Sequence, residues 1–195
     1  MQRRLVLLFA AVFIYAWQGI SAPNVWKDDP AHSSVHFSIA HLVISEVDGV
    51  FREFDATLTT GKDDYSDAKL EATIKVASIS TDNDRRDGHL RSGDFFDAEK
   101  YPTITFKSAS FTKTGDSTFK IAGDLTIRDV TKPVVLDAIY RGQVSMRGKT
   151  IIVFSASTEI NRFDYGVKWD AKLDTGGLVA GDKVKIQLDF EGVKQ

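Results

Sequence analysis

Alternation of apolar and polar residues is the dominant pattern along this chain. Phe119 and Ile121, for example, flank Lys120, and similar triplets recur through most of the sequence. A period of two places successive side chains on opposite faces of a β-strand, so the pattern predicts strands with one apolar face. About eight segments show it: residues 33–39, 49–59, 70–76, 104–106, 119–128, 134–140, 152–160 and 184–190.

The connections between these segments indicate an all-β domain with antiparallel neighbours. No strand–helix–strand spacing and no internal repeat interrupts them, and helix-like composition is confined to residues 39–47 and 84–100. Short turns join antiparallel strands, whereas parallel strands need long crossovers. Turn residues such as Gly, Asp, Lys and Ser gather at residues 60–64, 114–117, 147–149 and 180–183.

Two architectures satisfy strands with one apolar face: a sandwich and a closed barrel. An eight-stranded barrel has an interior that side chains can fill or that can hold one small ligand. The inward positions are rich in phenylalanine, which suits both a filled core and a slot for an alkyl chain. The alternation alone leaves these alternatives open.

Residues 81–97 break the alternation and form a charged segment. They contain three arginines, one histidine and five aspartates. Long charged loops on a repetitive scaffold often carry function. In one interpretation Arg85, Arg86 and Arg91 pair with the aspartates to hold a lid on the barrel. In the other, arginines and His89 contact the polar head group of a ligand.

The N-terminal residues are typical of a secretory signal peptide. Arg3 and Arg4 precede an apolar run over residues 5–17, and small residues follow at Gly19 to Ala22. The run is shorter than the roughly 20 residues that span a bilayer, which disfavours an uncleaved anchor. We therefore expect a signal peptide over residues 1–22, a domain over residues 23–195 and a periplasmic product. The exact cleavage bond stays open.

Composition narrows the range of functions. The chain has 195 residues, 43% of them hydrophobic and 27% charged, with a formal net charge of −2, which suits one globular domain. This charge balance predicts no nucleic-acid partner. Because the sequence has no cysteine, disulfides, thiolate metal sites, cysteine nucleophiles and a lipoprotein anchor are excluded.

The sequence predicts neither a metal site nor an enzyme. His32 and His36 would lie roughly 13 Å apart on one strand, too far to share a metal ion. His41 has no carboxylate at a spacing that completes a site. Neither a G-x-S-x-G nor an H-E-x-x-H motif is present. We expect no catalytic residue and no cofactor.

Five segments together resemble the YceI-like family of exported, lipocalin-like polyisoprenoid-binding proteins. They occur in the family's order and extend over nearly all of the sequence after residue 30. They are A-H-S-S-V-H-F-S-I-A-H-L (31–42), S-I-S-T-D-N-D-R-R-D-G-H-L-R-S-G-D-F-F-D (78–97), K-Y-P-T-I-T-F-K-S (100–108), G-D-L-T-I-R-D-V-T-K-P-V (123–134) and N-R-F-D-Y-G (161–166). Asp129 departs from the Gly or Asn common in the family, and Asp tolerates a positive φ less well.

The resemblance implies an extended lipocalin-like eight-stranded antiparallel β-barrel with a short helical insertion and an apolar channel. It further implies a polyisoprenoid ligand, of the isoprenoid quinone or polyprenyl phosphate type, or a similar long-chain amphiphile. Contact with a membrane surface to load the ligand stays open, and so does a homodimer. The alternative function is that of a stress or interaction protein, with a filled barrel, that acts through its charged loop. A lipid-modifying enzyme is the third hypothesis.

We chose candidate binding residues by assigning the apolar channel that the resemblance implies to the strand positions that the alternation predicts to point inward. Eight apolar residues are predicted to line it: Phe37, Ile39, Phe51, Phe54, Ile74, Phe106, Leu125 and Phe154. Five polar residues are candidates for head-group contact: Arg86, His89, Arg91, Asn161 and Arg162. For Asn161 and Arg162 a purely structural role, capping a turn at the end of a strand, is the competing interpretation.

Overall fold

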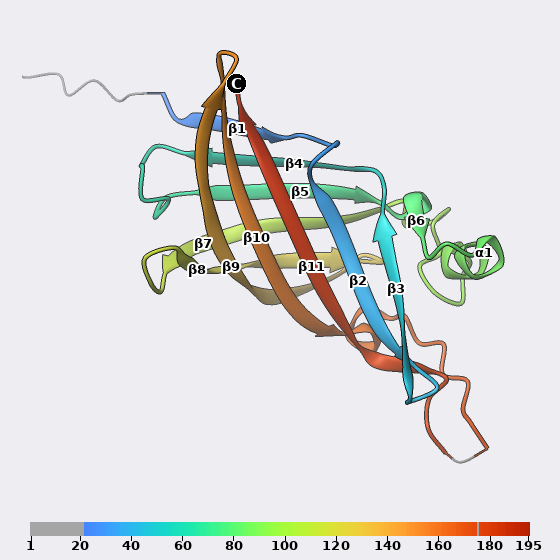
Figure 1. Cartoon of the computed structure of the whole chain (residues 1–195). Helices are drawn as coiled ribbons and strands as arrows, with labels where there is room; N and C mark the ends of the chain where they lie inside the picture. The colour runs from blue at the N-terminus through green and yellow to red at the C-terminus, as the bar shows by residue number, and fades with distance from the viewer. Residues whose placement is uncertain (1–21, 175) are drawn as a thin grey trace, which may run out of the picture.

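A computed structural model describes residues 22–174 and 176–195, so the predicted signal peptide lies almost wholly outside the described residues. A ring of eight antiparallel strands forms a closed barrel (Figure 1). In ring order the strands are β1 (Asn24–Asp28), β4 (Phe54–Thr60), β5 (Lys69–Lys75), β7 (Thr103–Lys113), β8 (Thr118–Ile127), β9 (Val130–Met146), β10 (Lys149–Asn161) and β11 (Ala180–Lys194).

The ring closes because β1 pairs with both β4 and β11. Trp26 lies opposite Lys194 on one edge and opposite Leu58 on the other. A closed barrel leaves no free edge in the ring. The eight strands of the ring, and the hydrophobic core that they enclose, are formed by residues 24–194.

The remaining strands extend the sheet at one end of the barrel. β2 (Ser34–His41) continues along the same edge of β11 that β1 uses, and β3 (Ser45–Phe51) pairs with β2. The short β6 (Ile79–Ser80) then pairs with the end of β3. The predicted strand over residues 49–59 is therefore broken between β3 and β4. The helix-like composition of residues 39–47 is instead a hairpin, because tertiary pairing with β11 overrides local propensity.

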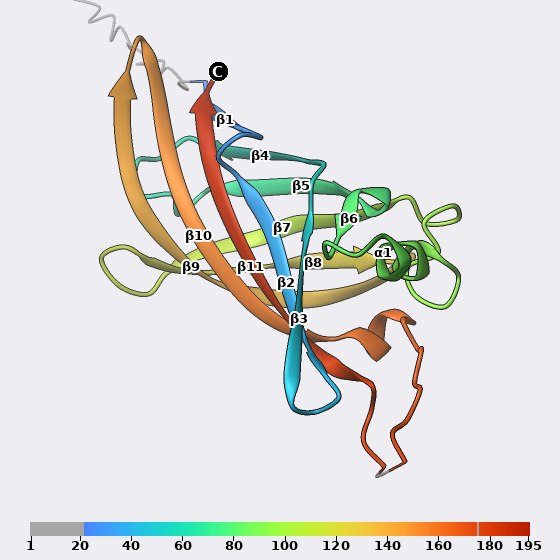
Figure 2. The ribbon, with the colours of Figure 1, turned by 45° about the vertical axis from the view of Figure 1, so that its right-hand side comes forward.

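The helical insertion predicted in the charged segment is confirmed. α1 (Asp84–Arg91) starts at Asn83, whose side chain accepts a hydrogen bond from the backbone N–H of Arg86. This is a standard N-cap. Two single turns of 3₁₀ helix, η1 (Val76–Ser78) and η2 (Arg162–Tyr165), flank it in space. Both views place α1 at the end of the barrel where β8 ends (Figures 1 and 2).

The turn between β8 and β9 shows how Asp129 is accommodated. Arg128 and Asp129 have φ of 51° and 59°, as in a two-residue hairpin loop with both residues left-handed. The Arg128 side chain compensates for this conformation. Its Nη1 donates to the carbonyl oxygens of Phe95 (2.6 Å) and Gly166 (2.8 Å), which ties the turn to the segment after α1 and to η2.

Within the described residues, no helix is long and apolar enough to cross a membrane.

Candidate functional site

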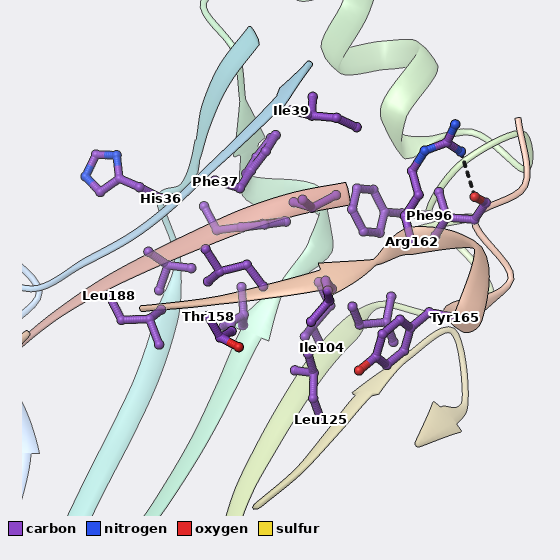
Figure 3. A pocket seen from close by; sticks show the side chains of 18 of the residues that line it. His36, Phe37, Ile39, Phe96, Ile104, Leu125, Thr158, Arg162, Tyr165 and Leu188 are labelled. Atoms are coloured by element: carbon purple, nitrogen blue, oxygen red, sulfur yellow. Dashed lines mark hydrogen bonds between the residues drawn. The ribbon is translucent and has the colours of Figure 1, made fainter. Parts of the chain in front are cut away.

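An apolar cavity of about 340 Å³ occupies the end of the barrel next to α1 (Figure 3). Its walls come from the inner faces of β2–β5 and β7–β11, and side chains of α1, of the segment after α1, and of η2 and the segment after it complete the wall. The volume lies at the lower end of the range for small-molecule sites. Seven of the eight residues predicted to line a channel lie on its wall: Phe37, Ile39, Phe51, Phe54, Ile74, Phe106 and Leu125.

Below this cavity, the barrel interior is filled by an aromatic cluster of Tyr65, Phe119, Tyr140 and Phe154. The Tyr65 and Phe154 rings are 5.2 Å apart and nearly perpendicular, and Tyr140 lies 5.1 Å from both. Edge-on packing at these distances is favourable for aromatic rings. Phe154 therefore packs below the cavity rather than on its wall, and its contact with a ligand stays a prediction.

The boundary between the hollow and filled halves can be followed along single strands. On β8, Leu125 lines the cavity, whereas Ile121 and Phe119 are buried in the filled half. On β9, Leu136 lines the cavity and Ala138 does not. All five residues follow the same alternation, so the sequence pattern predicts an inward side chain for each of them. Their distance along the barrel axis decides whether they face the cavity.

The end of the cavity next to α1, which we call the mouth, carries polar side chains. Arg86 and His89 of α1 lie on the cavity wall there, as does Trp169. His89 Nε2 is 2.8 Å from an Asp94 carboxylate oxygen, and its ring meets Trp169 edge-on at 5.7 Å. The arrangement places one cation and one imidazole where a head group would emerge from an apolar interior.

Two of the three arginines of the charged segment, Arg86 and Arg91, bind backbone carbonyls, which corrects the expected pairing with aspartates. Arg86 donates to the backbone oxygen of Thr81 (2.7 Å), and Arg91 donates to those of Ala77 and Ile79 (both 2.9 Å). Among the residues that the structure describes, Arg85, Arg86 and Arg91 form no ion pair with the five aspartates. Carbonyls at chain turns lack backbone partners, and a guanidinium can satisfy several of them.

Charge in this segment is instead balanced through Thr81. Its hydroxyl donates to the buried carboxylate of Asp87 (2.5 Å) and accepts a bond from Arg86 Nε (2.7 Å). The backbone N–H of Thr81 also donates to Asp87 (2.8 Å). Arg86 therefore reaches Asp87 through an intervening hydroxyl, and part of its hydrogen-bonding capacity is already used. Arg91 is anchored away from the cavity wall.

Arg162 is buried at the same end of the barrel, with only 5% of its surface exposed. Its guanidinium donates to the carbonyl oxygens of Val167 (2.7 Å), Ala180 (3.0 Å) and Gly181 (2.7 Å). Burial lowers the pKa of Arg162, and the acidic residues Asp182 and Asp170 partly offset this. Figure 3 shows Arg162 among the residues that line the cavity, with a hydrogen bond from its guanidinium drawn as a dashed line.

Asn161 has the capping role that the competing interpretation assigned to it. Its Oδ1 accepts a hydrogen bond from the backbone N–H of Phe163 (2.9 Å), and its Nδ2 donates to Asp182 (3.1 Å). The residue does not line the cavity. Of the five head-group candidates, Arg86, His89 and Arg162 therefore lie on the cavity wall, whereas Arg91 and Asn161 lie outside it.

Comparison with known proteins agrees with this geometry. The model of the YceI-like domain matches residues 26–192. The chain belongs to the YceI-like family. A UPF0312 protein of Staphylococcus aureus (strain bovine RF122) is 39% identical over 165 residues, which cover 84% of this chain and 94% of the relative.

Solved structures support the same YceI-like fold. The Campylobacter jejuni YceI protein has a TM-score of 0.68 and 34% identity, over 80% of this chain and 90% of that one. A polyisoprenoid-binding domain from Saccharophagus degradans has a TM-score of 0.66 at 14% identity, over 86% and 97%. BcnA of Burkholderia cenocepacia has a TM-score of 0.70 at 21% identity, over 84% and 98%. The last two comparisons establish the fold alone.

Two wall residues of this YceI-like chain escaped the sequence analysis because they lie outside the alternating segments. Trp169 follows η2 in an irregular segment and stacks 5.3 Å from Phe95 at the mouth. Tyr165 ends η2, and its ring points into the cavity (Figure 3). Burial raises the pKa of Tyr165 to about 12, so its hydroxyl stays protonated at neutral pH. Tyr165 belongs to the family segment at residues 161–166, whereas the only sequence signal at Trp169 was its aromatic character close to that segment.

Away from the cavity, the structure brings His32 together with two carboxylates that no spacing had suggested. His32 Nδ1 lies 3.2 Å from Oδ2 of Asp29 and 3.8 Å from Oε1 of Glu191. Asp29 also accepts a bond from the backbone N–H of Ala31 (2.9 Å). The Ala31 N–H and then His32 lower the pKa of Asp29, and Asp29 raises the pKa of His32. The group closes an exposed turn between β1 and β2.

Proposed function

We propose that this YceI-like protein binds and carries, or sequesters, a polyisoprenoid or similar long-chain amphiphile. The observation that carries the proposal is an apolar cavity inside the barrel with polar side chains at one end. Each buried CH₂ group contributes roughly 0.8 kcal/mol, so an alkyl chain can be held without any strong polar contact. The description of the Saccharophagus degradans neighbour as a polyisoprenoid-binding domain supports the same ligand class.

Binding is proposed here without catalysis. The cavity wall is almost entirely hydrocarbon, and the polar groups at its mouth are engaged with backbone carbonyls or with each other. Head groups of the isoprenoid quinone or polyprenyl phosphate type would meet Arg86, His89 and Arg162. The hollow half of the barrel favours this function over a filled-barrel interaction protein.

The test is to fill the cavity without disturbing the strand. Ala72 on β5 faces the cavity, and Ala72→Phe should place a ring where the ligand chain lies. We expect lipid recovered from organic extracts of the purified protein, measured by mass spectrometry, to fall at least about tenfold, while stability is kept because the ring is buried. Thr73→Phe, one residue along and exposed, is the matched control.

Two results would contradict the carrier function. One is wild-type protein that yields no stoichiometric lipid when purified from its own cells. The other is Ala72→Phe protein that retains as much lipid as Thr73→Phe.

We further propose that the protein works in the periplasm after removal of residues 1–22. The support is the sequence pattern alone: two arginines, a short apolar run and small residues at Gly19 to Ala22. The intact mass of exported protein should correspond to a chain that begins between Gly19 and Pro23. A mass that retains residues 1–17 would show that the apolar run stays attached.

A further inference from the structure

Three large apolar residues form the turn between β2 and β3, where small or polar residues are usual. We call Leu42, Val43 and Ile44 the apolar tip. Turns that need a left-handed backbone generally use Gly, Asn or Asp. Here Leu42 and Val43 have φ of 53° and 69°, and for a β-branched residue this is a strained conformation. An apolar sequence is therefore retained at a position where polar residues would fold more easily.

The apolar tip is also exposed. Val43 is 70% exposed and Ile44 is 88% exposed. Further along β3, Glu46 and Asp48 are exposed as an ordinary hairpin requires. The neighbouring loop lies against the apolar tip, because the side chains of Val43 and Leu173 both lie next to Gly177. Folding thus leaves a cluster of hydrocarbon in water, which needs a partner to become favourable.

The position of the apolar tip connects it to the cavity. The residues on either side of it, Ala40, His41 and Val47, line the cavity wall. The backbone N–H of Leu42 donates to the carbonyl of Val179 (2.9 Å), which is itself a wall residue. Both views show the β2–β3 hairpin and the loop before β11 projecting at the same end of the molecule (Figures 1 and 2).

We propose that the apolar tip inserts into the surface of a phospholipid bilayer and brings the cavity close to it. This inference rests on the proposed function, because a carrier of long-chain amphiphiles must take them from a membrane. An amphiphile could then move between bilayer and cavity with little exposure to water. Three side chains offer too little area for a stable protein interface, which buries about 800 Å² on each partner.

The charges near the apolar tip predict how the contact responds to salt. Lys168 and Lys172 in the adjoining loop are balanced by Asp170 and Asp174. Glu46, close to the apolar tip, forms an ion pair with Lys185, in which Oε1 lies 2.7 Å from Nζ. With no excess of positive charge, attraction to anionic lipids contributes little. Binding should therefore occur on zwitterionic vesicles and change little between low and high salt.

The experiment compares the Pro23–Gln195 chain with two tip variants in a flotation assay on phosphatidylcholine vesicles that contain no isoprenoid. Val43→Asn and Ile44→Ser should each reduce the bound fraction at least about tenfold, the effect of removing one large apolar side chain from a nonpolar environment. Val43→Asn should leave the thermal midpoint unchanged or raise it, because Asn adopts positive φ more easily. Loss of binding with unchanged or greater stability excludes unfolding as the cause.

Val144→Asn is the matched control. Val144 is 55% exposed on β9, toward the β9–β10 hairpin at the opposite end of the molecule, and its substitution should leave vesicle binding unchanged. The inference is overturned if wild type does not float with vesicles, or if Val144→Asn loses as much binding as the tip variants. It is also overturned if sedimentation shows a wild-type dimer that Val43→Asn dissociates, since the apolar tip would then bind a second copy.

Failure of this inference can be told apart from failure of the carrier function. Vesicle binding is measured without ligand, whereas the carrier function is judged by lipid extracted from the purified protein. If lipid is recovered but vesicles are not bound, the carrier function stands and the bilayer contact falls. If vesicles are bound but lipid is never recovered from the purified protein, the bilayer contact stands and the carrier function is contradicted.

Discussion

Replacing Ile104 with Asp should both destabilise the barrel and abolish ligand binding. Ile104 on β7 is 5% exposed, lies opposite Ile74 on β5 and lines the cavity. The variant loses a buried apolar side chain and places a carboxyl group among hydrocarbon. We expect a loss of about 3–5 kcal/mol in the free energy of unfolding, measured by urea titration. Lipid in organic extracts should fall to background.

The pH dependence of this variant gives a second check. Burial disfavours the ionised carboxyl, so the folded-state pKa of the new Asp should lie above its unfolded value of about 3.9. The folded state then binds more protons, and the variant loses stability as pH rises above the unfolded pKa. The destabilisation relative to wild type should therefore be smaller near pH 4 than at pH 7.

Thr103→Asp is the matched control for Ile104→Asp. Thr103 is the preceding residue, is exposed and pairs with Lys75 across the strands, so a carboxylate is tolerated there. Its stability and lipid content should equal those of wild type. If Ile104→Asp carries lipid as wild type does, the ligand does not lie in this cavity.

The second large effect is expected at Arg162. Arg162→Met keeps an unbranched apolar side chain, although a shorter one, and removes three hydrogen bonds to the carbonyls of Val167, Ala180 and Gly181. Each buried acceptor left without a partner costs about 1–3 kcal/mol, so a total of about 3–5 kcal/mol is expected where water reaches part of the site. Urea unfolding measures the change. Arg162→Lys should be intermediate, because one ammonium cannot reach all three carbonyls.

Arg141→Met is the control for this variant. Arg141 on β9 is exposed and makes a single side-chain bond to Ser155 (3.2 Å), so its loss should change stability by less than about 0.5 kcal/mol. An Arg162→Met protein as stable as wild type would show that water replaces the guanidinium fully. If stability is unchanged but lipid is lost, Arg162 is a ligand-binding residue first and a structural one second.

The charged segment illustrates why its fold could be predicted only in part. Its composition indicated a helical insertion, and the helix is present as α1. The partners of its arginines could not be read in the same way. Opposite charges close in sequence suggested ion pairs, but Arg91 binds carbonyls at Ala77 and Ile79, which tertiary folding brings to it. A sequence pattern does not show which backbone carbonyls will lack a backbone hydrogen-bond partner in the folded protein.

The candidate site was predicted to a similar extent. Alternation showed that Leu125, Ile121 and Phe119 all point inward, since a strand has only two faces. It did not show which of them faces the cavity and which packs against Phe154 in the aromatic cluster. That depends on height along the barrel axis, which strand register and closure through β1 set.

The sequence by itself determined the all-β class, the inward faces of the strands, the helical insertion and the family. These follow from periodicity and local motifs, which depend on neighbouring residues only. The tertiary structure decided that part of the barrel interior is hollow, that Arg86, His89 and Arg162 lie on the cavity wall, and that the apolar tip stands beside it. Each of these depends on which distant segments lie together, and local patterns do not encode such distances.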